Sequence, residues 1–172
     1  FISGGSSSSN RFYVQLLSSS QIRYGSSSGF DDVTVSTISS GSWHHIVTVH
    51  NGTSLDIYLD GVKQNSSPVT VVAPNANIGD DFTIGRYTIS PGYYWNGKLD
   101  EVAIFNVELT GPQVAAIYNG GTPNNILPLS PVLWSRFESL TTNAGVVTTA
   151  DSSGNGLTGT VENGAVLSTV VP

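Results

Sequence analysis

The chain has 172 residues, of which 38% are hydrophobic and only 10% are charged, and its formal net charge is −6. A chain of this length fits one domain, and its six scattered cations argue against a nucleic-acid partner, which needs a basic surface to displace phosphate counterions. There is no cysteine, so the sequence offers neither a disulfide nor a thiolate metal site. No apolar run approaches the roughly 20 residues that span a bilayer, and we therefore expect no membrane span.

Alternating apolar and polar residues predict a series of antiparallel strands in the first third of the chain. In the third of these segments, Val33 and Val35 are expected to face inward while the neighbouring threonines face water. Asn51-Gly52 supplies the positive-φ pair that a tight hairpin prefers, and Asp60-Gly61 turns the chain again. The expected strands cover residues 12–17, 21–25, 32–38, 43–50 and 54–59.

The middle of the chain contains three prolines, Pro68, Pro74 and Pro91. Proline cannot donate a hydrogen bond to a strand ladder, so strands in this region are expected to be short or to lie at sheet edges. Residues 82–87 are the best candidate for a core strand among them.

One short helix is predicted near residues 110–119. Thr110 and Gln113 have the spacing of a capping box, and Pro112 falls in the first turn, where a missing N–H costs nothing. Gly120-Gly121 is expected to end the helix as a C-terminal cap. Its apolar face would consist of Val114, Ile117 and Tyr118.

Three segments carry a resemblance to a known family. They read Trp-His-His-Ile-Val-Thr-Val-His (43–50), Leu-Asp-Ile-Tyr-Leu-Asp-Gly-Val-Lys (55–63) and Trp-Asn-Gly-Lys-Leu-Asp-Glu-Val-Ala-Ile-Phe-Asn (95–106). In this order, and followed by the short helix, they resemble the laminin-G/pentraxin-like branch of the concanavalin A-like lectins and glucanases. The match covers Gly97 to Tyr118 nearly position by position. The resemblance implies an all-β, antiparallel two-sheet jelly-roll sandwich, used for binding or structure and not for catalysis.

The strand and turn with which members of that family normally begin do not precede Phe1 in this sequence. The C-terminal segment looks like this opening. It contains Leu-Trp-Ser-Arg-Phe-Glu (133–138) and the turn Asp-Ser-Ser-Gly-Asn-Gly (151–156). The resemblance therefore divides the chain into a sandwich core (1–122), a proline-rich connector (123–131) and a segment (132–172) that completes the same sandwich or a neighbouring one. Folding back, starting a second copy and donating strands to a neighbouring subunit all fit this pattern.

No catalytic constellation stands out in the sequence. His44, His45 and His50 lie within or just after one strand, and we interpret them as strand histidines satisfied by hydrogen bonds. Asp100 and Glu101 are adjacent on an expected long strand, so their side chains are expected to point to opposite faces and not to share a substrate. The chain is therefore predicted not to be an enzyme and to require no cofactor.

Calcium is the metal that the resemblance implies, because hard cations prefer several oxygen ligands and the family often holds one Ca²⁺ at the sandwich edge. The matching positions are Asp100, Asp151, the carbonyl of Gly154 and Asn155. A purely structural role is the alternative, in which Asp151 makes an Asx turn and Asp100 pairs with a backbone amide. Two further acidic pairs are weaker candidates: Asp31-Asp32 and Asp80-Asp81.

An aromatic cluster is the candidate ligand site. Tyr93, Tyr94, Trp95 and Asn96 precede the expected long strand, and Arg86 and Tyr87 lie nearby in the sequence. Aromatic rings beside amide and guanidinium groups are suited to binding a sugar. Packing in the core and against another subunit is the alternative use of the same side chains.

Together these observations predict a non-enzymatic structural or adhesive module on an extracellular or virion surface, such as a decoration, fibre or tail component. Similar domains occur in structural proteins of tailed phages. Its partners would be other protein subunits in a homo-oligomer. A lectin or carbohydrate-binding module, dependent on calcium, is the alternative, with glycans as the partners.

The calcium hypothesis has a direct test in the melting temperature. If Asp100 and Asp151 hold Ca²⁺, chelation by EDTA should lower the melting temperature, because an ion that binds only the folded state stabilises it. Thermal unfolding with added Ca²⁺ and with EDTA measures this difference. An unchanged melting temperature would contradict calcium binding.

Overall fold

The computed structural model describes most of the chain and divides it into two compact units. The first unit contains Phe1–Gly97 and Thr110–Gly121, and the second contains Lys98–Leu109 and Thr122–Pro172. The described residues are 2–7, 10–26, 29–65, 69–70, 82–88, 90, 92–168 and 172. The predicted interruptions at Pro68, Pro74 and Pro91 and the acidic pair Asp80-Asp81 lie outside them.

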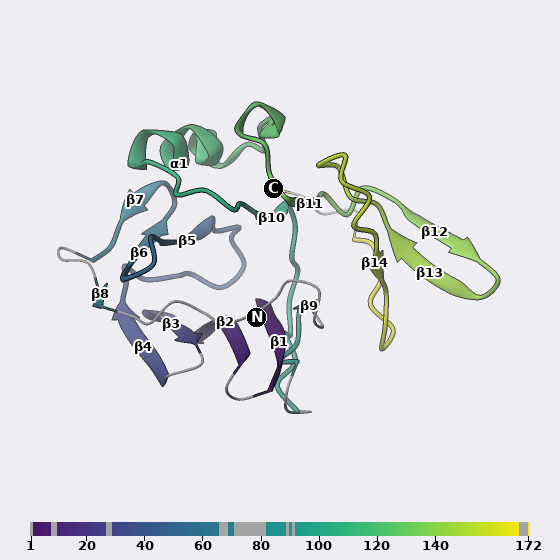
Figure 1. Ribbon diagram of the computed structural model, residues 1–172, viewed down its shortest axis with the longest axis horizontal. Coiled ribbons are helices and arrows are strands. Elements are labelled where there is room, and N and C mark those ends of the chain that lie inside the picture. Colours follow the sequence, from purple (N-terminus) through teal and green to yellow (C-terminus); the bar gives the residue numbers. More distant parts are fainter. Residues whose placement is uncertain are drawn as a thin grey trace. The chain divides into compact units, whose positions relative to one another are not determined.

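The first unit contains a five-stranded antiparallel sheet with the strand order β4-β3-β2-β1-β9 (Figure 1). Its strands are β1 (Ile2–Ser7), β2 (Asn10–Ser18), β3 (Gln21–Ser26), β4 (Gly29–Thr34) and β9 (Phe82–Ile84). The hairpins β2-β3 and β3-β4 connect neighbouring strands, and the first of them agrees with the strands expected at residues 12–17 and 21–25. The third predicted strand was placed too far along the chain, because pairing with β3 ends at Thr34.

A second antiparallel sheet in the first unit is built around β6. Its strands are β5 (Ile46–His50), β6 (Ser54–Leu59), β7 (Val62–Lys63) and β8 (Val69–Thr70), of which β8 also pairs with β6. In the hairpin that joins β5 and β6, both Asn51 and Gly52 were predicted to have positive φ. The prediction is confirmed for Gly52, with a φ of 101°, and wrong for Asn51. The Asn51 side chain instead accepts hydrogen bonds from the amides of Thr53 and Ser54. The second turn is as expected, since Asp60 and Gly61 both have positive φ.

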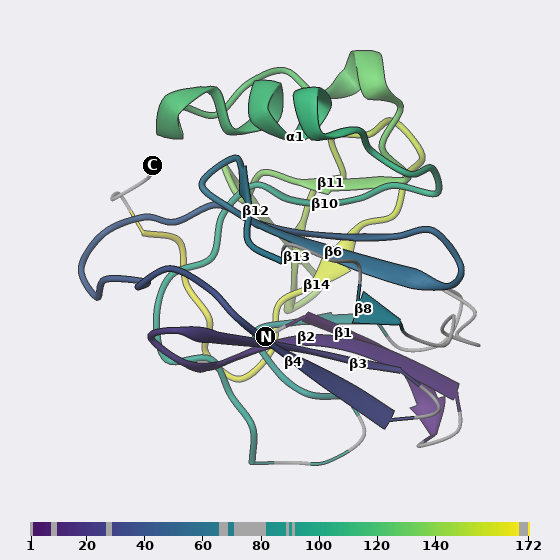
Figure 2. The same cartoon turned by 90° about the vertical axis from the view of Figure 1, so that its left-hand side faces the viewer.

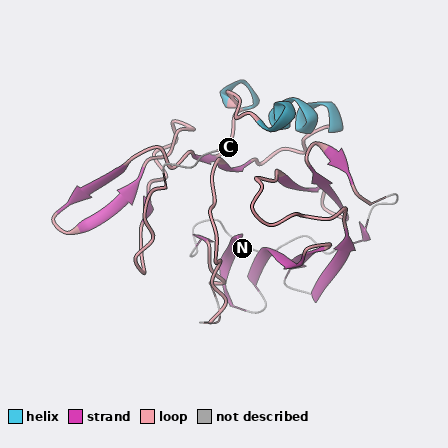
Figure 3. Ribbon diagram, turned by 180° about the vertical axis from the view of Figure 1, so that it is seen from behind, coloured by secondary structure: helices cyan, strands magenta, loops and turns pink. Residues whose placement is uncertain are grey.

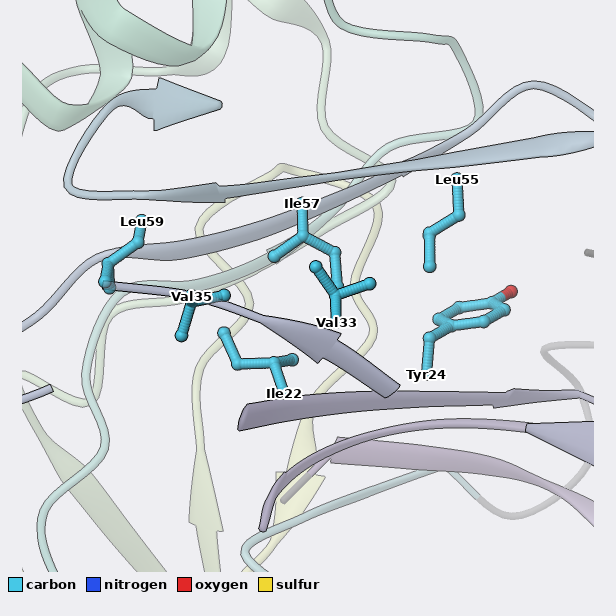
Figure 4. Packing of buried hydrophobic residues seen from close by; sticks show 7 residues of the cluster. All are labelled: Ile22, Tyr24, Val33, Val35, Leu55, Ile57 and Leu59. Carbon is cyan, nitrogen blue, oxygen red and sulfur yellow. The ribbon is translucent and has the colours of Figure 1, made fainter. Parts of the chain in front are cut away.

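The two sheets of the first unit form separate layers with the apolar core between them (Figures 2 and 4). The five-stranded sheet contributes Ile22, Tyr24 and Val33, the residue after β4 contributes Val35, and β6 contributes Leu55, Ile57 and Leu59. Val33 and Val35 are buried as predicted. This burial is the main favourable term that holds the sandwich together.

The described part of the chain contains one α-helix, α1 (Gly111–Tyr118), shown in cyan in Figure 3. The predicted capping box is confirmed: the Thr110 hydroxyl accepts the Gln113 amide N–H, and the Gln113 side chain accepts the Thr110 amide N–H. The end of the helix was predicted one residue late, because Asn119 is the left-handed C-cap, with a φ of 46°. Asparagine tolerates this conformation through local hydrogen bonding of its side chain. Antiparallel sheets with a single short helix confirm the predicted fold class.

The second unit pairs the C-terminal segment with the strongest motif of the sequence. Strand β10 (Val102–Ile104) pairs antiparallel with β11 (Leu133–Ser135) of the same chain. Whether this pairing completes the predicted sandwich stays a prediction. The remaining strands form a three-stranded sheet: β12 (Leu140–Asn143), β13 (Val146–Thr149) and β14 (Gly159–Thr160). Two short 3₁₀ turns, η1 (Asn119–Gly121) in the first unit and η2 (Leu127–Leu129) in the second, accompany these elements.

The prediction that Asp100 and Glu101 lie in a long strand was wrong. β10 begins only at Val102, because Glu101 has a φ of 51°, in the left-handed region. Strand alternation therefore does not apply to Asp100 and Glu101. Among the described residues, no helix has the length and apolar character to cross a membrane.

The core predicts a clear difference between two substitutions in the second sheet. Ile57 is fully buried, so Ile57→Ala should lower the free energy of unfolding by about 3 kcal/mol through lost burial and the cavity left behind. Val62 is 63% exposed, and Val62→Ala should change it by less than about 0.5 kcal/mol. Urea unfolding measures both, and equal effects would contradict the described packing.

Candidate functional site

The turn at residues 151–157 fixes the start of β11. The Asp151 carboxylate accepts the backbone N–H of Trp134 at 3.0 Å, and the amide of Ser152 donates back to the Trp134 carbonyl at 2.7 Å. On the other side of the turn, the Asn155 amide group donates to the Val132 carbonyl at 2.9 Å. The predicted metal ligands Asp151 and Asn155 are therefore brought together, and both hold the backbone of one strand.

The Asp151 carboxylate is saturated with hydrogen-bond donors. Its Oδ1 accepts the amides of Trp134 and Ser153, and its Oδ2 accepts the Ser153 hydroxyl and the amide of Leu157. Burial alone would raise the pKa of Asp151, but these hydrogen bonds outweigh it and lower that pKa to about 2. The hydrogen bond from the Ser153 backbone N–H to Asp151, two residues earlier in the chain, forms the Asx turn that was the alternative to a metal site.

Calcium does not fit this arrangement of Asp151. A carboxylate has about four lone-pair sites, and each oxygen here already accepts two hydrogen bonds. The other predicted acidic ligand, Asp100, accepts the amide of Glu101 at 3.0 Å, and burial raises its pKa. Within the described residues, no group of three His, Cys, Asp or Glu side chains is suited to a metal ion. Calcium binding stays a prediction, and it would require Asp151 to give up hydrogen bonds. The fourth predicted ligand, the carbonyl of Gly154, lies in the same turn, where Gly154 has a φ of 88°.

Glu101 is held by Trp134 of β11 and by Arg136, the residue that follows β11. Its Oε2 accepts the indole N–H of Trp134 at 2.6 Å, and its Oε1 accepts a hydrogen bond from Arg136 at 3.3 Å. Arg136 also lies 5.1 Å from the centre of the Trp134 ring and pairs with Glu138. A polar cavity of about 80 Å³ beside Arg136 is well below the roughly 300 Å³ of a typical ligand pocket.

The three histidines differ in their hydrogen bonds. The expectation that they are satisfied holds for His44, but Nδ1 of His45 and Nε2 of His50 are buried without a partner. Their rings stack on tyrosines instead, at 5.9 Å from Tyr118 for His45 and 5.8 Å from Tyr24 for His50. Burial lowers the pKa of both histidines, which keeps them neutral near pH 7.

Ser39, His44 and Asp60 have the spacing of a nucleophile, a base and an orienting acid. The Ser39 hydroxyl lies 3.0 Å from His44 Nε2, and His44 Nδ1 lies 2.9 Å from the Asp60 carboxylate. The Nε2 lone pair, however, also accepts the Ser39 backbone N–H at 3.1 Å. Because a general base needs that lone pair for the hydroxyl proton, we assign these residues to holding the loop before β5 and not to catalysis.

The predicted aromatic ligand cluster is divided between two faces of a hairpin. The Tyr87 amide donates to the Tyr93 carbonyl, and Arg86 and Tyr94 form the neighbouring bridge. Tyr87 and Tyr93 therefore lie on one face, and Arg86 and Tyr94 on the other. Tyr93 and Tyr94 are 55% and 60% exposed. Trp95 is partly buried and its amide donates to the Gly85 carbonyl, while Asn96 is exposed.

A cluster of hydroxyl groups fixes this hairpin to the five-stranded sheet. Ser3, which is 1% exposed, lies 3.0 Å from the Thr83 hydroxyl and 2.6 Å from the Thr88 hydroxyl. Ser3 Oγ also accepts the Thr88 amide N–H, and the Arg86 carbonyl accepts a hydrogen bond from Thr83. The hairpin is therefore held beside β1 in part by buried polar contacts.

Two residues that sequence reasoning missed lie against this hairpin. The Tyr13 ring contacts the Tyr87 ring edge to face at 5.2 Å, and the Arg11 guanidinium lies 5.5 Å from the Tyr13 ring and donates to the Tyr87 hydroxyl. The Tyr13 ring also covers the backbone of Gly25, where an added Cβ would lie 2.0 Å from it. The sequence did hold a signal for these two residues. Phe12 and Val14 alternate with residues 11 and 13 along the strand, so residues 11 and 13 face the side of the sheet away from the core.

Comparisons with known proteins identify the fold family. A family model, Laminin_G_3, described as the concanavalin A-like lectin/glucanases superfamily, matches residues 1–115. A search of curated proteins gave no significant match. One similar solved structure is an S-layer domain-containing protein (residues 221–444) from Clostridium thermocellum, with 19% identity and a TM-score of 0.42. The alignment covers 69% of this chain and 61% of that one, and at this level of similarity it carries no argument about function.

The low pKa of Asp151 predicts an acid-dependent loss of stability. A carboxyl with a folded pKa of about 2 and an unfolded pKa near 3.9 stabilises the fold above about pH 5, and this contribution is lost as the pH falls toward 2. Asp151→Asn should lower the free energy of unfolding by about 2 kcal/mol at pH 7. Between pH 5 and pH 3 the free energy of unfolding should fall less in this variant than in the wild type.

Urea unfolding at pH 7, 5 and 3 measures this effect. Asp31→Asn is the matched control, because within the described residues no hydrogen bond joins the Asp31 side chain to a partner. Equal losses for the two variants at pH 7 would contradict the role of Asp151 in holding β11.

Proposed function

Because this chain belongs to the concanavalin A-like lectin/glucanases superfamily, we propose that it is a non-enzymatic module with a structural or adhesive role in an exterior assembly. The assembly would be a virion or cell-surface structure, with the chain as a decoration, fibre or tail component and other subunits as its partners. The family's fold is typically non-enzymatic. Weak charge and the absence of cysteine agree with an extracellular or virion surface location.

The observation that carries this proposal is the exposed three-stranded sheet of the second unit. Thr149 is the buried residue of its strands, whereas Thr141, Thr142 and Val146 are exposed. A small sheet of three strands needs a hydrophobic face or packing against another element to be stable. A neighbouring subunit that covers this sheet would supply the missing burial, as exposed apolar side chains commonly do at protein interfaces.

A lectin is the second candidate function. Tyr93 and Tyr94 favour it, because two strongly exposed tyrosines on one hairpin offer rings on which a sugar could stack. Calcium at Asp100 and Asp151 is an optional part of this candidate, and it requires Asp151 to give up hydrogen bonds.

The two candidates differ in the mass of the particle in solution. A structural module should form multimers whose mass, measured by light scattering during gel filtration, exceeds the 18.0 kDa of the chain. A chain that stays monomeric as its concentration rises, and that binds a sugar on a glycan array, would contradict the structural role and support the lectin.

A further inference from the structure

The face of the five-stranded sheet that points away from the core carries a row of aromatic and arginine side chains. Tyr13 opposes Gly25 in the ladder, and Gly25 opposes Phe30, so these positions share one face. Arg23 lies on the same face and stacks 3.7 Å from the centre of the Phe30 ring. We call this surface the tyrosine–arginine face; it consists of Arg11, Tyr13, Arg23, Phe30, Tyr87 and Tyr93.

Exposed rings lie at both ends of this face. Phe30 on the edge strand β4 is 56% exposed, and Tyr93 on the hairpin is 55% exposed. Between them, Tyr87 contacts both Tyr13 and Tyr93 edge to face. Tyrosine and arginine are the residue types that most often dominate binding energy at protein interfaces, and rings ordered in this way lose little entropy when a partner covers them.

The two arginines of the face differ in their charge compensation. Arg23 makes a bidentate ion pair with Asp32, at 2.6 and 2.9 Å, which lowers the pKa of that carboxyl. Arg11 is only partly exposed, its Nε is buried without an acceptor, and within the described residues no ion pair joins it to an acidic side chain. Partly removing an uncompensated charge from water costs free energy, which a carboxylate from outside the chain would recover.

This chain itself carries a surplus of carboxylates. Asp and Glu number 12 against six Lys and Arg. One of them, Glu108, is exposed and has no ion-pair partner within the described residues, and it follows Val107, which is 58% exposed. An exposed apolar side chain beside an unpaired carboxylate complements a face of exposed rings around an unpaired arginine.

From this complementarity we infer that the tyrosine–arginine face docks the Val107-Glu108 turn of a second copy of the chain, with Glu108 of that copy pairing with Arg11. The inference rests on the proposed assembly role and adds to it a second interface, distinct from the three-stranded sheet. Because the two surfaces differ, the contact is heterologous, and repetition of it builds a ring or a filament.

Charge reversal tests this contact directly. Arg11→Glu and Glu108→Arg should each weaken self-association by about tenfold or more, because each places like charges at the same contact. The double variant R11E/E108R should restore association by exchanging the two charges. Analytical ultracentrifugation at low and high salt measures all four proteins, and the wild-type association should weaken as salt screens the pair.

Matched controls separate the contact from general effects of charge and folding. Lys63→Glu makes the same charge change on a cation that already pairs with Asp56, and it should leave self-association unchanged. Tyr93→Ala should weaken association, whereas Tyr94→Ala, on the opposite face of the hairpin, should not. Near-ultraviolet circular dichroism confirms that each variant is folded.

The outcomes distinguish the inference from the proposed function. A wild-type chain that stays monomeric would overturn both. Multimers that persist unchanged in R11E, or that R11E/E108R fails to restore, would overturn the interface while leaving the assembly role in place.

Discussion

Burial of one face of the five-stranded sheet against β6 determines which side chains the other face presents. Residues directly opposite one another in an antiparallel sheet share a face, and neighbours along a strand lie on opposite faces. Because Tyr24 and Val33 point into the core, Arg23 and Asp32 must point away from it. The apolar core and the tyrosine–arginine face are therefore consequences of one register, and a slip of one residue would exchange them.

The features that the sequence predicted correctly depend on near neighbours. The capping box of α1 requires only Thr110 and Gln113, and the burial of Val33 and Val35 follows from alternation along neighbouring residues. The helix end was missed by one residue because asparagine and glycine can both take the left-handed conformation, and local sequence does not decide between Asn119 and the glycines after it.

The parts that sequence reasoning missed depend on contacts between distant residues. Glu101 has a left-handed conformation, so β10 begins only at Val102, and the Glu101 carboxylate accepts the indole N–H of Trp134, far along the chain. Contacts between distant residues also arrange the candidate ligand cluster: Tyr93 contacts Tyr87, which lies nearby in the sequence, and Tyr87 contacts Tyr13 of β2, which sequence reasoning did not connect with it. Alternation assigns a residue to a face, yet it does not say which distant hairpin will lie over that face.

The contact between Tyr13 and Gly25 has a consequence for how the sheet can change during evolution. The Tyr13 ring occupies the space where any side chain at position 25 would begin. A larger residue at position 25 becomes acceptable only when position 13 loses its ring, and the loss of the ring also removes a support of Arg11. Related sequences should therefore show correlated exchange at positions 13 and 25, with glycine at one accompanying an aromatic residue at the other.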